Sequence, residues 1–192
     1  MKTNNQRALL AVTMTLAILC TAESCDQKKV KKAFREWNIK AGKMAVECNS
    51  AWDGYYKGVA DQHTEDIIKE YGEDPTWSDD MAEAEFTKRM AKLDESNEKF
   101  ELSMNIIANS LEAIEQSLDA ADHIDGKLWK KGIKDILKAL DAVTMILNEA
   151  AKEVDDEKFN AALNWIGVVT NGANSIMDMI GVEDGPDDPK DD

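Results

Sequence analysis

Apolar residues recur in alternating steps of three and four along four segments of the chain, at residues 26–71, 78–123, 127–154 and 156–180. Such steps keep an apolar stripe on one face of an α-helix. Because the alternation continues without a slip, it is typical of coiled coils and helix bundles. The chain is therefore predicted to be all-α, with four helices that bury their stripes against one another.

The residues of these stripes are the expected core of the bundle. In the first segment they contain Val30, Phe34, Trp37, Ala41, Met44, Cys48, Ala51 and Tyr55. In the second they contain Phe86, Met90, Leu93, Asn97, Phe100, Met104, Ile107, Leu111, Ile114, Leu118 and Ala121. The last two contain Ile133, Ile136, Leu140, Val143, Leu147, Ala150 and Val154, and Phe159, Ala162, Ile166, Val169, Ala173, Ile176 and Ile180. A lone asparagine in a stripe, such as Asn97, commonly sets helix register or partner orientation.

Short polar segments separate the four helices. Residues 72–78 contain a glycine and a proline and end at Ser78, a predicted N-cap. Asp125-Gly126 forms the second break, and Asp155-Asp156 forms the third and supplies another N-cap. Connections this short indicate antiparallel neighbours. The predicted fold is an antiparallel up-down-up-down four-helix bundle, coiled-coil-like in its packing.

The helices differ in predicted length. The first two have about 45 residues each and the last two about 25–30, so the shorter pair covers only part of the longer pair. The first hairpin, around residues 60–85, is therefore expected to project as a two-helix arm. The alternative is a first helix that breaks near Gly54 and Gly58 and folds this arm back.

The N-terminus has the pattern of a secretory signal peptide. Lys2 and Arg7 precede a mostly apolar run, residues 8–20, which is followed by small residues up to Ala22. The run is short for a membrane span, although a retained short anchor is the alternative. We expect an exported protein, periplasmic, cell-envelope or extracellular, with a signal peptide at 1–22, a helical domain at 23–182 and a disordered acidic tail at 183–192.

Cleavage after Ala22 would leave Cys25 and Cys48. Two cysteines in an oxidising compartment suggest a disulfide, but on one helix they would lie over about 30 Å apart, so either that helix breaks or they do not pair. Cys25 is also a candidate for lipidation, with Ser24 before it. Cys48 lies on the apolar stripe, where a buried thiol is expected.

The net charge is −15, and removal of Lys2 and Arg7 with the signal peptide makes it −17. This charge argues against nucleic-acid binding, which relies on Lys and Arg at phosphates. The cations are nevertheless concentrated at two predicted helix starts. They are Lys28, Lys29, Lys31, Lys32, Arg35, Lys127, Lys130, Lys131 and Lys134. The bundle order brings them to one end, where either an anionic membrane surface or the acidic tail could neutralise them.

No pattern of residues indicates an enzyme. His63 and His123 have no partner at helical zinc or di-iron spacing, and the chain contains no phosphate loop, nucleophile elbow or dinucleotide fingerprint. No catalytic residue, metal site or cofactor is therefore predicted.

Five of the twelve aromatic residues fall within residues 52–77: Trp52, Tyr55, Tyr56, Tyr71 and Trp77. On a projecting arm they are candidate contacts for a partner protein, because Trp and Tyr are enriched at binding hot spots. The alternative is a small local core near the helical turn.

We therefore expect a non-enzymatic exported protein that acts through protein–protein interaction, with a partner that the sequence does not specify. The alternative is a membrane-active or lipid-binding bundle, favoured by the apolar fourth helix and by Trp129 among lysines. Pairing of two copies through the long hairpin also agrees with the pattern.

Overall fold

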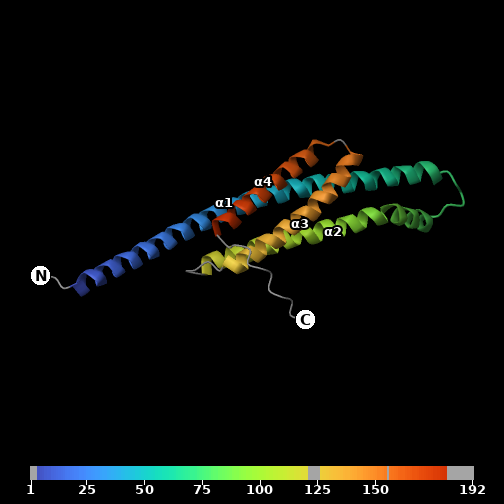
Figure 1. Cartoon of the computed structure of the whole chain (residues 1–192). Helices are drawn as coiled ribbons and strands as arrows, with labels where there is room; N and C mark the ends of the chain where they lie inside the picture. Colours follow the sequence, from blue (N-terminus) through green and yellow to red (C-terminus); the bar gives the residue numbers. More distant parts are fainter. Residues whose placement is uncertain (1–3, 121–125, 155, 181–192) are drawn as a thin grey trace.

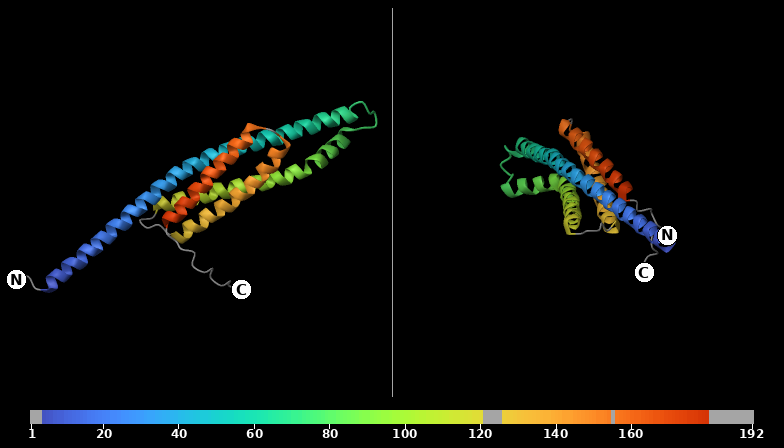
Figure 2. Two further views of the ribbon diagram at one scale, coloured as in Figure 1. Left: turned by 45° about the horizontal axis from the view of Figure 1, so that its top comes forward. Right: turned by 90° about the vertical axis from the view of Figure 1, so that its left-hand side faces the viewer.

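The computed structural model describes the backbone of residues 4–120, 126–154 and 156–180, and the side chains of residues 27–118, 129–154 and 156–180. The described chain is all-α and has four helices: α1 (Asn4–Tyr71), α2 (Asp79–Ala120), α3 (Gly126–Glu153) and α4 (Glu157–Ile180) (Figure 1). The helices form a bundle in which α1 packs mainly against α4, and α2 mainly against α3. Smaller interfaces join α1 to α2 and α3 to α4 (Figure 2).

The predicted stripes form the core. Every predicted position from Val30 to Ala51 in α1 is buried, and so are those from Ile133 to Ala150 in α3 and from Phe159 to Ile176 in α4. In α2 the buried positions include Phe100, Ile107, Leu111, Ile114 and Leu118, whereas Phe86, Leu93, Asn97 and Met104 are half-buried. Val154 is 41% exposed because it follows the last turn of α3.

Two predicted N-caps are confirmed. The Ser78 Oγ accepts a hydrogen bond from the Met81 N–H at 3.4 Å, one turn into α2. The Asp156 carboxylate accepts one from the Lys158 N–H at 2.9 Å at the start of α4. Both caps satisfy N–H groups that a helix N-terminus leaves unpaired.

Helix α1 continues through Gly54 and Gly58, so the predicted alternative of a break at these glycines is wrong. The helix also begins well before the predicted start at residue 26. The predicted signal peptide, Cys25, Lys127 and the acidic tail lie outside the residues whose side chains are described. Over the described residues, no helix combines the length and the apolar character that a membrane crossing requires.

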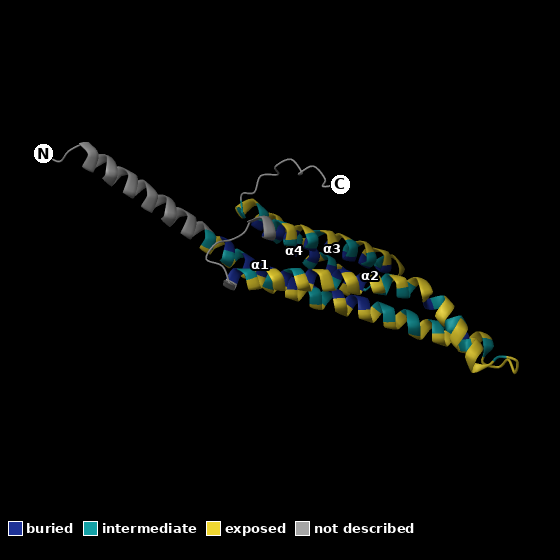
Figure 3. Cartoon of the chain, turned by 90° about the horizontal axis from the view of Figure 1, so that it is seen from below, coloured by how far each residue is buried: buried dark blue, intermediate teal, exposed yellow. Residues whose placement is uncertain are grey.

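The end of α1 and the start of α2 continue beyond the connection between α3 and α4 (Figures 1 and 2). We call residues 56–94 the arm, and the four packed helices around the apolar core the body. Most arm positions are exposed or half-buried, whereas buried positions concentrate in the body (Figure 3). Within the arm only Ile67 and Met90 are buried, because two helices cannot enclose an apolar core.

One close contact fixes the packing of α1 on α4. The Trp37 indole donates a hydrogen bond to the Val169 carbonyl oxygen at 2.7 Å. A Cβ atom on Gly172 would lie only 2.5 Å from Trp37 Cδ1, so the indole occupies the space that a side chain there would need. The same indole packs edge-on against Phe34, with ring centroids 5.3 Å apart.

Replacement Gly172→Ala is expected to destabilise the protein by about 1–3 kcal/mol, because the buried Trp37 ring has to move. Gly167 is the matched control, since it is an exposed glycine of α4 at which an added Cβ would meet no atom within 4 Å. Gly167→Ala should stabilise the helix by about 0.5–1 kcal/mol. Urea unfolding followed by circular dichroism measures both changes, and equal effects would contradict the Trp37 contact.

Candidate functional site

The five aromatic candidates do not form one surface. The structure places Trp52 in the core, Tyr55 where α1 meets α3 and α4, and Tyr56 between α1 and α2 in the arm. Tyr71 and Trp77 lie at the far end of the arm, on either side of the turn between α1 and α2. The sequence cluster therefore separates into residues that hold the fold and residues that remain at the surface.

Trp52 is a core residue, with 2% of its surface exposed. Its ring stacks on Phe100, with centroids 5.2 Å apart, and its indole N–H donates to the Asn97 Oδ1 at 2.7 Å. Asn97 therefore satisfies a buried indole within the chain, and its amide also donates to Glu101 at 2.9 Å. Trp52 borders a surface hollow between α1 and α2 but exposes too little of its surface to offer a partner much contact area.

Tyr55 and Tyr56 are half-buried, and each hydroxyl has a carboxylate partner. The Tyr55 hydroxyl donates to Glu153, and its ring meets Phe159 edge-on with centroids 6.0 Å apart. The Tyr56 hydroxyl donates to Asp94 at 2.6 Å across the arm. Burial and the Glu153 bond raise the pKa of Tyr55, and the Asp94 bond is the main cause of the raised pKa of Tyr56. Both tyrosines hold helices together.

Tyr71 and Trp77 stack face to face, with ring centroids 3.8 Å apart and planes within 4°. Both are half-buried, and the Trp77 Nε1 is enclosed without a hydrogen-bond partner among the described residues. Ile68 is 64% exposed in the last turn of α1, and Met81 is 45% exposed in the first turn of α2. We call these four residues the tip patch. Sequence reasoning missed Ile68 and Met81, although they lie on either side of the same turn.

The turn that carries the tip patch has its own internal bonds. The Asp74 carboxylate accepts hydrogen bonds from the Thr76 N–H at 2.8 Å and from the Thr76 hydroxyl at 2.7 Å. These bonds lower the pKa of Asp74. The backbone N–H of Trp77 donates to the backbone carbonyl oxygen of Asp74 at 3.1 Å. Trp77 is thus positioned by a turn that Asp74 stabilises. Aspartate is favoured in turns because its side chain can accept a hydrogen bond from a backbone N–H two residues later.

Below the tip, the arm is held by charged groups. Arg89 donates to Glu70 across the two helices at 2.8 Å, and to Glu85 on its own helix at 2.9 Å. These bonds raise the pKa of Arg89 and lower the pKa of Glu85. His63, also in the arm, is half-buried. Polar contacts therefore replace the apolar core here.

The two basic segments lie at one end of the body. Phe34 and Trp129 are in ring contact, with centroids 5.4 Å apart, which brings the start of α3 beside the corresponding part of α1. The exposed cations of these segments are Lys28, Lys29, Lys32, Arg35, Lys131 and Lys134. Lys31 and Lys130 are half-buried, and Lys127 lies outside the described side chains. Lys31 donates to the Leu118 carbonyl at 3.0 Å, in the last turn of α2.

Trp129 does not lie among these lysines at the surface. It is 1% exposed, and its indole N–H donates to the Ser117 hydroxyl at 2.8 Å. The interfacial placement expected for Trp129 is therefore wrong, because the ring packs in the core, whereas Lys131 and Lys134 of the same helix are exposed. One argument for a membrane-active bundle is thereby lost.

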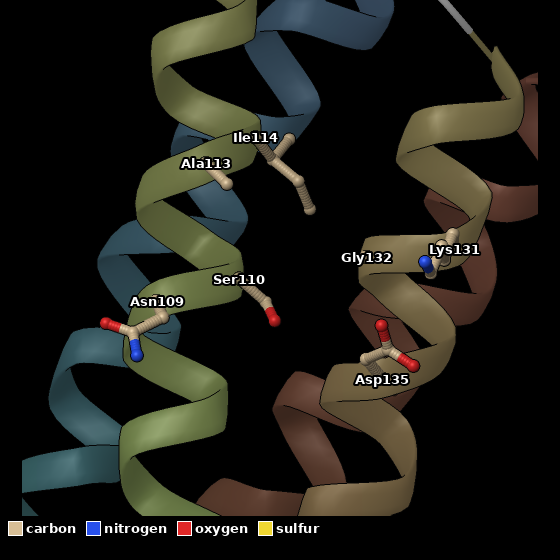
Figure 4. Close-up of a pocket in the computed structure, with 7 residues that line it drawn as sticks. All are labelled: Asn109, Ser110, Ala113, Ile114, Lys131, Gly132 and Asp135. Atoms are coloured by element: carbon tan, nitrogen blue, oxygen red, sulfur yellow. The ribbon is translucent and has the colours of Figure 1, made fainter.

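A shallow groove runs between α2 and α3. One part, of about 280 Å³, is lined by Asn109, Ser110, Ala113, Ile114, Lys131, Gly132 and Asp135 (Figure 4). A second part, of about 510 Å³, shares Asn109, Ser110 and Asp135 with it. One carboxylate, that of Asp135, lies with lysines, Ser110 and small residues along this groove. Over the described residues, no cluster of His, Cys, Asp or Glu is arranged to hold a metal ion.

Comparison with known proteins adds no family. No protein-family model, curated protein or solved structure matches this chain.

Cys48 is free and fully buried, and burial is the main cause that raises its pKa to about 12. Helix α1 is continuous from Cys25 to Cys48, so the two cysteines lie about 35 Å apart and cannot pair within one chain. Cys48 is therefore a packing residue.

Iodoacetamide at pH 8 should leave Cys48 unmodified in the native protein and alkylate it in guanidinium chloride. Reactivity requires the thiolate, and a buried thiol with a pKa of about 12 supplies almost none. Peptide mass spectrometry measures the modified fraction at this position. Rapid modification of native Cys48 would contradict its burial.

Alanine substitutions at Trp52 and at Trp77 should differ in their effect on the free energy of unfolding. Trp52→Ala is expected to cost about 3–5 kcal/mol of unfolding free energy, because it leaves a core cavity and removes the hydrogen bond to the Asn97 Oδ1. Trp77→Ala removes one stacked ring outside the body and should cost about 1 kcal/mol or less. Chemical denaturation of both variants tests this, and a larger loss for Trp77→Ala would reverse the assignment.

Proposed function

We propose that this chain is a non-enzymatic interaction protein that acts outside the cytoplasm and contacts a partner protein through the tip patch. The observation that carries the proposal is the exposure of Ile68 and Met81 beside the stacked Tyr71–Trp77 pair, away from the apolar core. Apolar side chains gathered at an exposed end cost free energy in water, and contact with a partner recovers it.

We further propose that the bundle is antiparallel and up-down-up-down, with a longer projecting first hairpin. Cross-helix pairs support this arrangement. Asn38 bonds to Glu115, Trp52 to Asn97 and Glu70 to Arg89, so residue numbers rise along α1 as they fall along α2. The Trp37–Val169 and Tyr55–Phe159 contacts reverse in the same way between α1 and α4, as expected for short connections.

The construction of the arm supports a contact role. Its helices are joined below the tip by the Tyr56–Asp94 bond and by Arg89, which bonds to Glu70 on α1 and to Glu85 on α2. A surface that is positioned before binding loses less conformational entropy when a partner arrives. Tyr and Trp at such a surface bury large areas with few rotatable bonds.

Export is part of the proposal and rests on residues 1–22 alone. Their positive start, apolar run and small residues support a cleaved signal peptide and a periplasmic, cell-envelope or extracellular location. Lipidation of Cys25 would anchor the body to a membrane and leave the arm pointing away. Intact mass spectrometry of the mature protein tests both points.

Membrane-surface binding is the second candidate, because the basic segments meet at one end of the body. Its cations suit an anionic lipid surface. Flotation with phosphatidylglycerol vesicles at low salt distinguishes the two functions. Binding that Lys131→Gln with Lys134→Gln abolishes would favour the membrane, whereas no binding would leave the tip patch as the candidate.

The tip proposal predicts selective loss of a partner. Wild-type bait should capture the partner from an extract of the source cells. Bait with Tyr71→Ala and Trp77→Ala should capture at most about a tenth of that amount, because paired aromatic residues act as hot spots. The control bait carries Ile39→Ala with Val46→Ala, two exposed apolar residues of the body, and should capture the partner normally. Quantitative mass spectrometry measures the retained amounts, and equal capture by all three baits would remove the tip from the function.

A further inference from the structure

The tip patch is surrounded by negative charge. Residues 65–85 contain nine acidic residues and one lysine, Lys69. The acids are Glu65, Asp66, Glu70, Glu73, Asp74, Asp79, Asp80, Glu83 and Glu85. The next cations along the chain, Lys88 and Arg89, already bond to Glu85 and Glu70. The patch therefore presents apolar and aromatic groups within a strongly negative field.

Some of these acids stabilise the arm through hydrogen bonds or through the helix dipole, and others do not. Glu70 and Glu85 hold Arg89, Asp74 holds the turn, and Asp66 accepts from Gln62 at 2.9 Å. Asp79 and Asp80 lie in the first turn of α2, where the helix dipole favours acids. The exposed carboxylates of Glu65, Glu73 and Glu83 have no hydrogen bond or ion pair within the described chain.

Building on the proposed function, we propose that the tip patch binds a cationic, arginine- or lysine-bearing segment of another protein. A guanidinium group can stack on the outer faces of the Tyr71–Trp77 pair while the surrounding carboxylates accept its hydrogen bonds. The alkyl stems of the same side chains can cover Ile68 and Met81. One type of residue thus matches the apolar, aromatic and acidic parts of the tip.

The Trp77 indole adds an independent observation. Its N–H is enclosed and lacks an acceptor among the described residues, a cost that natural proteins rarely leave uncompensated. Trp37, Trp52 and Trp129 each have an acceptor within the chain. A small rotation of Trp77 on binding would let a backbone carbonyl of the bound segment accept this hydrogen bond.

Other occupants fit the tip less well. Nucleic acids and anionic lipid surfaces share its negative charge and are repelled. The basic end of a second copy has the correct charge, but a chain with net charge −15 repels its own copies. Sedimentation of the chain alone tests that occupant, and association that depends on Tyr71 and Trp77 would overturn the assignment to another protein.

The test uses the full chain labelled with ¹⁵N, because five tryptophans give five separate indole N–H signals. The probes are two synthetic peptides with the same leucine spacing, one with arginine at four positions and one with glutamate there. The arginine peptide should shift the Trp77 signal and leave those of Trp37, Trp52 and Trp129 unchanged. The glutamate peptide should shift none of them.

Matched variants separate local from overall charge. Glu65→Gln, Glu73→Gln and Glu83→Gln together should weaken arginine-peptide binding by at least about tenfold. The control replaces three exposed acids on α2, α3 and α4, with Glu98→Gln, Asp141→Asn and Asp178→Asn. It has the same net charge and should bind like the wild type. Equal weakening by both triple variants would overturn the proposal, because the attraction would then follow net charge alone.

Failure of this inference is distinct from failure of the proposed function. A Trp77 signal that stays fixed with the arginine peptide overturns the cationic partner. Partner capture that still requires Tyr71 and Trp77 would then keep the tip as a contact surface for a partner of different chemistry. Capture that is independent of both residues would remove the tip altogether.

Discussion

The difference in helix length is the constraint on which the rest of this structure depends. Helix α2 has 42 residues, whereas α3 has 28 and α4 has 24. At 1.5 Å per residue, α2 is about 20 Å longer than α3 and cannot be covered along its whole length. The chain therefore has one part where four helices enclose an apolar core and one part where only two helices meet.

The chemistry of the interior changes where the covering helices end. In the body, Phe34, Trp37 and Trp129 form a packed aromatic group, and Gly172 leaves the space that Trp37 occupies. In the arm, helix contacts are made by Tyr56 with Asp94 and by Arg89 with two glutamates. Polar side chains that stay in contact with water do not incur the free-energy cost of burial. The body supplies stability, and the arm carries the surface that we propose for recognition.

Sequence periodicity predicted the body well, because a core position is enclosed by neighbours and has to be apolar. It predicted less in the arm, where the buried Met90 continues the stripe of the second segment but the buried Ile67 belongs to no predicted stripe. The aromatic cluster was misleading for a related reason. Ala51 and Trp52 are adjacent and both buried, and Trp52 packs toward α2. A count of aromatic residues could not distinguish this core tryptophan from Tyr71 and Trp77, which lie at the end of the arm.

Hydrogen–deuterium exchange along the chain tests most directly whether a two-helix arm extends from a four-helix body. Amides of residues 57–92 should exchange much faster than those of residues 34–52 and 100–118, because the helices of the arm lack an apolar core and open locally. Equal protection of the arm and the body would contradict this arrangement, since the arm would then be enclosed as fully as the rest of the bundle.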